Sequence, residues 1–250
     1  YSSSQVCRQF RQSFHFSPSA YREKRRLERA AVLLALTPLN IAQIAVRCGY
    51  HNHSSFSRAF QRRYQFSPRH FRQRLKNSVA SSMPYKPYKT DIEKISDRQM
   101  ILMRLYQAPE RIKGLGDTSY HNEQLACLQA RLRRSTTIIE LPDILAIKVD
   151  ALNSEYFHYN RTDVGLYLEQ TDNAQDIALP VPYRRVDIPT HYCLSTRFDN
   201  LADLYDALTH TLVHLLYNQN DFHVSGHPPQ VLWQANHLEL RIPLVGQLAG

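Results

Sequence analysis

The sequence predicts an α + (α+β) protein. Its N-terminal region is expected to be all-α, built of tandem helix-turn-helix units, and an α+β domain of two ββαββ-like repeats is expected to follow. Three observations predict this division. A motif recurs fifty residues after its first copy, the charge changes sign along the chain, and the apolar spacing changes from helical to alternating after about residue 90.

The repeated motif is FQRRYQFSPRHF at Phe60–Phe71, which matches FRQSFHFSPSAY at Phe10–Tyr21. In each copy a helical stretch ends at an aromatic residue and Ser-Pro follows. A serine before a proline is typical of a helix start, because serine caps free amides and the φ angle of proline is already helical. Aromatic anchors in register indicate one helical unit copied in tandem.

The stretch ahead of the second copy predicts the other helices of that unit. Asn40–Val46, NIAQIAV, has apolar residues at helical spacing, and the helix should stop at Gly49, where the backbone needs a conformation that glycine tolerates. A second helix is expected to begin near Asn52–Ser55. This order is the layout of a helix-turn-helix, whose second helix enters the DNA major groove.

The charge distribution agrees with a nucleic-acid partner for the N-terminal region. Residues 1–89 carry 17 Lys and Arg against 2 Asp and Glu, a net +15, whereas residues 90–250 carry 14 against 20, a net −6; together they give the +9 of the whole chain. One basic stretch is often only a solvated surface. A whole helical region nearly free of carboxylates favours contact with phosphates.

Ile41–Arg58, IAQIAVRCGYHNHSSFSR, and the following AFQRRYQFSPRHFRQRL resemble the second helix-turn-helix of the AraC/XylS family of bacterial transcription regulators. The resemblance covers about residues 1–76. It implies two units joined by a long helix, here about Pro18–Leu36, that read two successive major-groove segments on one face of the DNA. Tyr1 aligns with the tyrosine of a Gly-Tyr turn, so the opening helices of the family are not in this sequence, and we expect the first unit to be less well packed.

The candidate DNA-binding residues share the exposed sides of the two predicted recognition helices, at spacings of three and four residues. Val6 and Phe10 in the first helix, and Phe56 and Phe60 in the second, are expected to face inward. Candidates for base or backbone contact are Ser4, Cys7, Arg8, His53, Ser54, Ser57 and Arg58, although the serines could instead cap helix starts. Candidates for phosphate contact are Arg62, Arg63, Arg69 and Arg72.

Composition predicts a DNA-binding domain at 1–76, a linker at 77–89 containing serine and two prolines, and a second domain at 90–250. In the second domain we expect two rounds of strands around a helix. The expected strands are Asp91–Ile95, Gln99–Gln107, Ile144–Ala151, Val164–Glu169, Arg184–Ile188, His191–Phe198, Gln230–Gln234 and His237–Ile242, and the expected helices are His121–Arg134 and Leu201–Tyr217.

The second domain is rich in aromatic residues: nine of the 15 tyrosines and the single tryptophan lie beyond residue 90. An aromatic pocket with a buried carboxylate suits a cationic or amphipathic organic ligand. The stretch resembles the gyrase-inhibitor-like effector-binding domain, and the whole chain resembles the Rob subgroup; the ending LELRIPL resembles that domain's final strand. The resemblance implies Glu239 as a ligand carboxylate, with Tyr106, Tyr167 and Trp233 beside it. A structural carboxylate is the alternative.

Other classes of function find little support. The four cysteines lack metal spacing and are expected to be reduced thiols. Asp206, His210 and His214 have helical spacing for a metal, but exposed histidines explain them more simply. No hydrolase, phosphate-loop or metalloprotease motif and no membrane span is present. We therefore expect no enzyme, cofactor or membrane partner.

The sequence thus predicts a cytoplasmic, nucleoid-associated regulator that binds double-stranded DNA and recruits RNA polymerase. Its second domain would bind a small-molecule effector or a protein. The alternative is a ligand-sequestering or protein-inhibiting module with a vestigial DNA-binding unit. A weak dependence of DNA binding on salt would favour that alternative.

Overall fold

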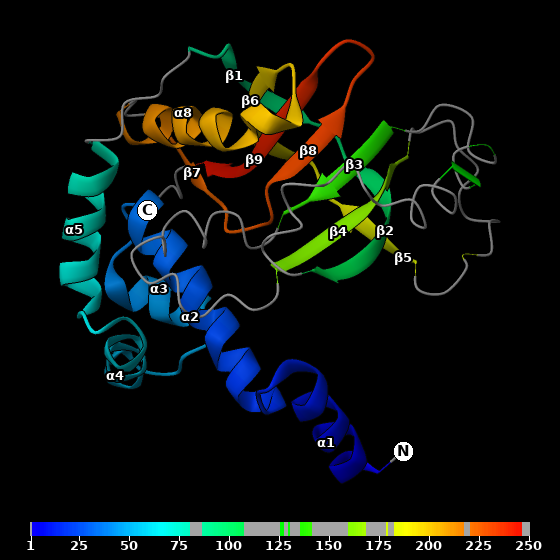
Figure 1. Cartoon of the computed structure of the whole chain (residues 1–250). Helices are drawn as coiled ribbons and strands as arrows, with labels where there is room; N and C mark the ends of the chain where they lie inside the picture. The colour runs from blue at the N-terminus through cyan, green and yellow to red at the C-terminus, as the bar shows by residue number, and fades with distance from the viewer. Residues whose placement is uncertain are drawn as a thin grey trace. The chain divides into compact units, whose positions relative to one another are not determined.

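The computed structural model describes residues 2–80, 87–107, 136–141, 160–168, 183–217 and 221–246, with a few isolated positions between them. The chain divides into two compact units, Tyr1–Ser78 (unit 1) and Val79–Gly250 (unit 2). Unit 1 is helical, and unit 2 is an antiparallel sheet with a helix packed on it (Figure 1). The predicted fold class is confirmed.

Unit 1 contains the helices α1 (Ser3–Phe14), α2 (Pro18–Leu36), α3 (Ile41–Arg47), α4 (His53–Tyr64) and α5 (Pro68–Ala80). The second half of α2, from Leu27, is buried except at Arg29, and α2 contacts α1, α3 and α4. Helix α3 starts with a capping box between Asn40 and Gln43 and is followed by Gly49 at a φ of +77°, as the sequence predicts. Helix α5 runs into the expected linker as far as Ala80.

The fifty-residue repeat is a structural repeat. Helices α1 and α4 both end at a residue with left-handed φ, His15 at 59° and Gln65 at 62°. A serine then caps the next helix: Ser17 Oγ accepts from the amide of Ala20 and Ser67 Oγ from that of His70. The same three rings meet in each copy, Phe10–Phe14–Tyr21 at 4.5–5.7 Å and Phe60–Tyr64–Phe71 at 4.5–5.1 Å between centroids.

Among its described residues, unit 2 has a nine-stranded sheet in the order β1-β6-β9-β8-β3-β4-β2-β5, with β7 paired to β9. Strands β1, β2, β3 and β4 form one repeat, and β5, β6, β8 and β9 are the corresponding strands of a second repeat. With this assignment, the order of strands read from one edge of the sheet is the same as the order read from the other edge. The first strand of each repeat pairs with the second strand of the other. The strands are β1 Thr90–Ile95, β2 Arg98–Gln107, β3 Thr136–Glu140, β4 Asn160–Tyr167, β5 Arg184–Ile188, β6 His191–Phe198, β7 Phe222–Val224, β8 Gln230–Trp233 and β9 Leu238–Gly246.

Two strands were not predicted. The run TTIIE of β3 directly follows a segment with helical spacing, and β7 has only three residues, too few for an alternating pattern. The expected strand Ile144–Ala151 and most of the expected helix His121–Arg134 lie outside the described residues. The expected helix Leu201–Tyr217 is a 3₁₀ turn, Leu201–Asp203, followed by α8, Leu204–Tyr217.

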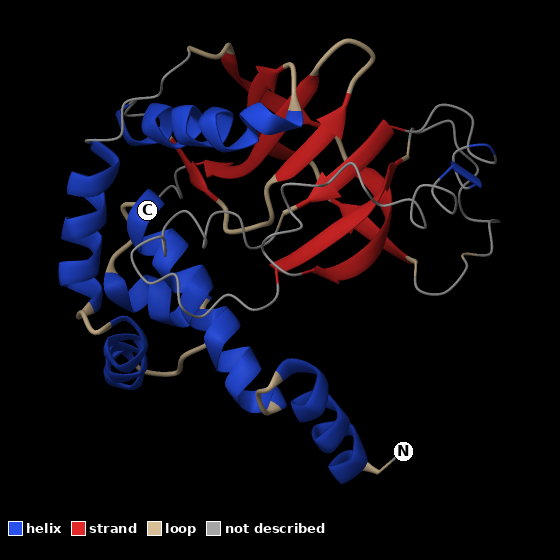
Figure 2. Cartoon of the chain, viewed as in Figure 1, coloured by secondary structure: helices blue, strands red, loops and turns tan. Residues whose placement is uncertain are grey.

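Helix α8 packs on β6 and β9 and so defines one face of that part of the sheet (Figure 2). Thr196 on β6 and Thr211 on α8 join the two elements by a hydrogen bond of 2.8 Å between their hydroxyls. Because side chains alternate along a strand, Ser195 on β6 and its cross-strand partner Arg241 on β9 lie on the opposite face. We call that opposite face the polar face.

Candidate nucleic-acid interface

Helix α4 has one buried and one exposed side. Asn52 caps it, accepting the amide of Ser55 at 2.7 Å. The buried side consists of Phe56, Ala59, Phe60 and Tyr64. Of the predicted DNA-contact residues, His53, Ser54 and Arg58 are exposed and Ser57 is half-buried. The helix therefore presents a polar surface that is fixed from behind by aromatic packing.

Helix α1 is presented differently. Ser4, Cys7 and Arg8 are exposed as predicted, but α1 contains no buried residue at all. The prediction that Val6 faces inward is wrong, because its side chain is 50% exposed, whereas Phe56 at the equivalent position of α4 is 0% exposed. The reason is that α3 packs behind α4, and among the described residues no helix stands behind α1 in that way.

The arginines predicted to hold phosphate differ in their surroundings. Arg62 is exposed and ion-paired with Glu23 at 3.0 Å, and Arg69 is exposed. The Arg63 guanidinium lies 5.1 Å from the ring centroid of Tyr64. Arg72 is half-buried: its Nε donates to the Leu34 carbonyl at 3.1 Å and its Nη2 to the Leu39 carbonyl at 2.6 Å. Arg72 thus satisfies one carbonyl in the last turn of α2 and one just after that helix.

A groove with a volume of about 540 Å³ lies where α3, α4 and α5 meet. The predicted residues His53, Arg69 and Arg72 line it. Asn40 and Gln73, which were not among the predicted site residues, line it too. The Asn40 amide donates to Gln43 Oε1 at 2.9 Å, so the wall formed by the start of α3 is held by its capping box. The N-x-x-Q spacing of that box was the signal that could have placed Asn40 at a helix start.

The effector residues predicted in unit 2 do not all come together. Strand register places Tyr167 and Glu239 on the polar face. The paired residues Gly165, Ile138, Leu232 and Glu239 lie side by side across four strands, and Tyr167 is two residues from Gly165 on β4, so it faces the same way. Trp233 pairs with Leu238 and so faces the other way, which makes the grouping of Trp233 with Glu239 wrong. The backbone of Tyr106 pairs with Arg161, but its side chain lies outside the described residues.

Glu239 is buried and fully hydrogen-bonded. Its Oε1 accepts from Ser195 Oγ at 2.8 Å and from Arg241 Nε at 2.7 Å, and its Oε2 accepts from Gln234 Nε2 at 3.4 Å. Burial alone would raise the pKa of Glu239, but the hydrogen bond and charge of Arg241, with the two other donors, outweigh it and lower that pKa below its ordinary value. Glu239 is therefore an ionised, paired carboxylate.

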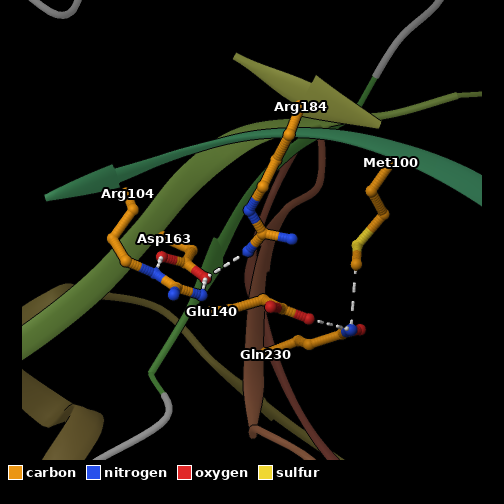
Figure 3. A network of polar contacts seen from close by, with 6 residues as sticks. All are labelled: Met100, Arg104, Glu140, Asp163, Arg184 and Gln230. Atoms are coloured by element: carbon orange, nitrogen blue, oxygen red, sulfur yellow. Dashed lines mark hydrogen bonds and ion pairs between the residues drawn. The ribbon is translucent and has the colours of Figure 1, made fainter. Parts of the chain in front are cut away.

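A second buried carboxylate network lies on the same face and was missed by the sequence interpretation (Figure 3). Asp163 binds Arg104 through two bonds of 2.8 and 2.9 Å and Arg184 through one of 2.7 Å. Beside it, Gln230 Nε2 donates to Glu140 at 3.0 Å. Asp163 stands opposite Arg104 as Glu239 stands opposite Arg197, so the two carboxylates occupy matching positions in the two repeats. Their separation in sequence concealed this match.

The histidines considered for a metal have other neighbours. Asp206 accepts a hydrogen bond from Tyr88 Oη at 3.1 Å, and Nδ1 of His210 lies 3.4 Å from Thr90 Oγ1. Within the described ranges, no group of three or more metal-binding side chains occurs.

Comparison with known proteins identifies unit 1. Residues 1–74 match the family model described as a helix-turn-helix domain. The HTH-type transcriptional regulator AlkR of Acinetobacter baylyi is 44% identical over 64 residues, which are 26% of this chain and 21% of that protein. The C-terminal domain of the response regulator yesN from Fusobacterium nucleatum is 30% identical over 28% of this chain and 69% of that chain, at a TM-score of 0.28. Residues 1–74 therefore form a helix-turn-helix domain that is similar in sequence to that of HTH-type transcriptional regulators.

The match to the helix-turn-helix family model covers residues 1–74, and the chain spans about a fifth of the length of AlkR. A putative transcription regulation protein from Staphylococcus aureus covers 64% of this chain and 100% of its own, at 11% identity and a TM-score of 0.41. A likeness at that level assigns neither a ligand nor a role to unit 2. In the part of the chain that the structure describes, no helix is long and apolar enough to cross a bilayer.

Proposed function

We propose that this chain is a bacterial transcription regulator that binds duplex DNA through unit 1 and receives a signal through unit 2. The observation that carries the proposal is the repeated pair of helices. Helices α1 and α4 expose an arginine at equivalent positions, Arg8 and Arg58, and each is followed by the same turn and aromatic cluster. Two such helices would read two successive major-groove segments.

Base reading is assigned to the exposed sides of these helices, with Arg8 and Arg58 as the residues able to bind guanine O6 and N7 in bidentate fashion. The serines, Cys7 and His53 would make weaker contacts. Phosphates would be held by Arg62, Arg63 and Arg69. The groove between α3, α4 and α5 supports Arg69 and His53 in this role, because it places a guanidinium and an imidazole beside helix starts that carry partial positive charge. Arg72 also lines this groove, but its Nε and Nη2 are bound to carbonyls, so its proposed role is to hold the groove wall in place.

Unit 2 is proposed as the sensor. Among the described residues, its polar face carries three buried carboxylates, Glu140, Asp163 and Glu239, with Tyr167 on the same face. Such a mixture of apolar, aromatic and fixed polar groups is what small-molecule sites contain. The signal would then alter recruitment of RNA polymerase at promoters on the bacterial nucleoid.

The test compares Arg58 with Arg62 on the same helix. Duplexes that bind the chain are first selected from a random-sequence pool, and affinities of Arg58→Ala and Arg62→Ala are measured by fluorescence anisotropy on a selected and a scrambled duplex. Loss of a bidentate base contact should cost Arg58→Ala about 1–3 kcal/mol on the selected duplex alone. Arg62→Ala, the matched control, should weaken both duplexes alike.

Equal losses on the two duplexes would reduce Arg58 to a phosphate contact. If the selection enriches no duplex at all, the sequestering module with a vestigial DNA-binding unit becomes the better description.

A further inference from the structure

The polar face contains the two features that would attract an organic cation, a buried carboxylate and an aromatic ring. Each already has a cation of this chain beside it. Arg241 Nε donates to Glu239 at 2.7 Å, and the Arg98 guanidinium lies 5.4 Å from the centroid of the Tyr167 ring. Both contacts lie within the usual range for an ion pair and a cation–π interaction.

These residues come from three strands, and the strand register places all of them on the polar face. Burial raises the pKa of the Tyr167 phenol, while the positive charges of Arg241 and Arg98 act in the opposite direction. The Glu239 and Arg241 side chains are 6% and 12% exposed, so water screens their pairing only weakly. A buried pair of this kind is electrically neutral from the outside.

We infer that Arg241 is a specificity-determining residue, an internal counter-ion that occupies the cation position at Glu239 and excludes permanent organic cations from unit 2. Arg98 has the same role at the Tyr167 ring. An incoming cation would have to displace a guanidinium that makes a charge-assisted hydrogen bond, and would leave Arg241 buried without a partner. This inference rests on the proposal that the polar face of unit 2 takes a small molecule, and it corrects the expectation of a cationic effector.

The experiment measures binding of tetraphenylphosphonium to the full chain by isothermal titration calorimetry. The wild-type chain should show only weak binding that does not saturate, and this sets an upper limit on its affinity. Arg241→Met retains much of the side-chain volume and removes the charge, so Glu239 should become a cation site with an affinity at least tenfold above that of wild type. The double variant Glu239→Gln/Arg241→Met has no net charge to offer and should return to the wild-type result.

Arg98→Met provides a second variant. Arg98 is only half-buried, so replacing it does not leave a buried carboxylate without its partner. Uncovering the Tyr167 ring should raise the affinity at least threefold over wild type even if Arg241→Met does not fold. Wild-type binding as tight as that of the variants overturns the inference, as does a folded Arg241→Met or Arg98→Met chain that gains nothing. If the variants gain affinity for tetraphenylphosphonium but no small molecule is found to bind the wild-type chain, the inference about Arg241 holds and the proposed sensor role of unit 2 fails.

Discussion

Glu239 and Arg241 are two residues apart on β9, so both side chains lie on the polar face and bind each other there. Their pairing is a property of the folded state only. The pKa of Glu239 is lowered from its ordinary value of 4.5, chiefly because Arg241 and the two neutral donors overcome the effect of burial. The folded chain consequently binds this proton less readily than the unfolded chain does.

This difference predicts the direction of a pH effect. Stabilisation by Glu239 should be fully present above pH 4.5 and should be lost as the pH falls through the lowered pKa. Urea unfolding of unit 2, followed by the fluorescence of Trp233, measures it between pH 7 and pH 3. Glu239→Gln should be less stable at pH 7 and should lose less on acidification. An identical pH profile for wild type and variant would contradict the assignment.

Arg72 shows what residue-level inspection of a sequence misses. Arg69 and Arg72 are both arginines on the same basic helix, and composition treats them alike. In the fold, Arg69 is exposed while Arg72 binds two carbonyls 33 and 38 residues away. Such long-range bonds leave no mark in the local pattern.

At the scale of elements, α1 and α4 share a sequence pattern but differ in packing. Phe56 is completely buried and contacts the rings of Tyr50 and Phe60 at 5.4 and 5.6 Å, whereas Val6 is half exposed. Repeat symmetry in the sequence is therefore not matched by symmetry in stability, and α4 is the better supported recognition helix.

A matched pair of substitutions tests this difference. Phe56→Ala should lower the free energy of unfolding by about 3–5 kcal/mol through the cavity it leaves. Val6→Ser should change it by less than about 0.5 kcal/mol, because the side chain already meets water. Urea unfolding followed by far-ultraviolet circular dichroism, which reports mainly the helices of unit 1, gives both values. Similar losses for the two variants would show that α1 is packed as firmly as α4.

The helices of unit 1 could be predicted because their signals are local: Ser-Pro starts, Gly49 and aromatic residues at helical spacing. The strands of unit 2 were found mostly where alternation was clear, but their partners were not. Strand β1 pairs with β6 rather than with its neighbour β2, an exchange that only the fold reveals. Trp233 faces away from Glu239 because the residue paired with Glu239 is Leu232, its neighbour on β8. Composition alone does not determine which of two consecutive strand residues faces a given side of the sheet.

At the scale of the whole molecule, charge and fold change together. Basic residues occur in both units, but 20 of the 22 Asp and Glu lie in the sheet unit, so the average charge of the chain describes neither unit. A helix-turn-helix unit joined to a separate domain suits the proposed division of work between DNA binding and response to a signal. Each unit has its own core, and a variant in one should leave the fold of the other intact.

The central claim is that unit 1 binds duplex DNA through a basic, repeated helical surface. The most direct test is the binding constant of the full chain for a selected duplex, measured from 50 to 200 mM salt. Phosphate neutralisation predicts a straight line of log K against log salt, with a slope close to −0.9 for each phosphate held and a loss of about 10³-fold for six contacts. An affinity that stays constant over this range would contradict the account.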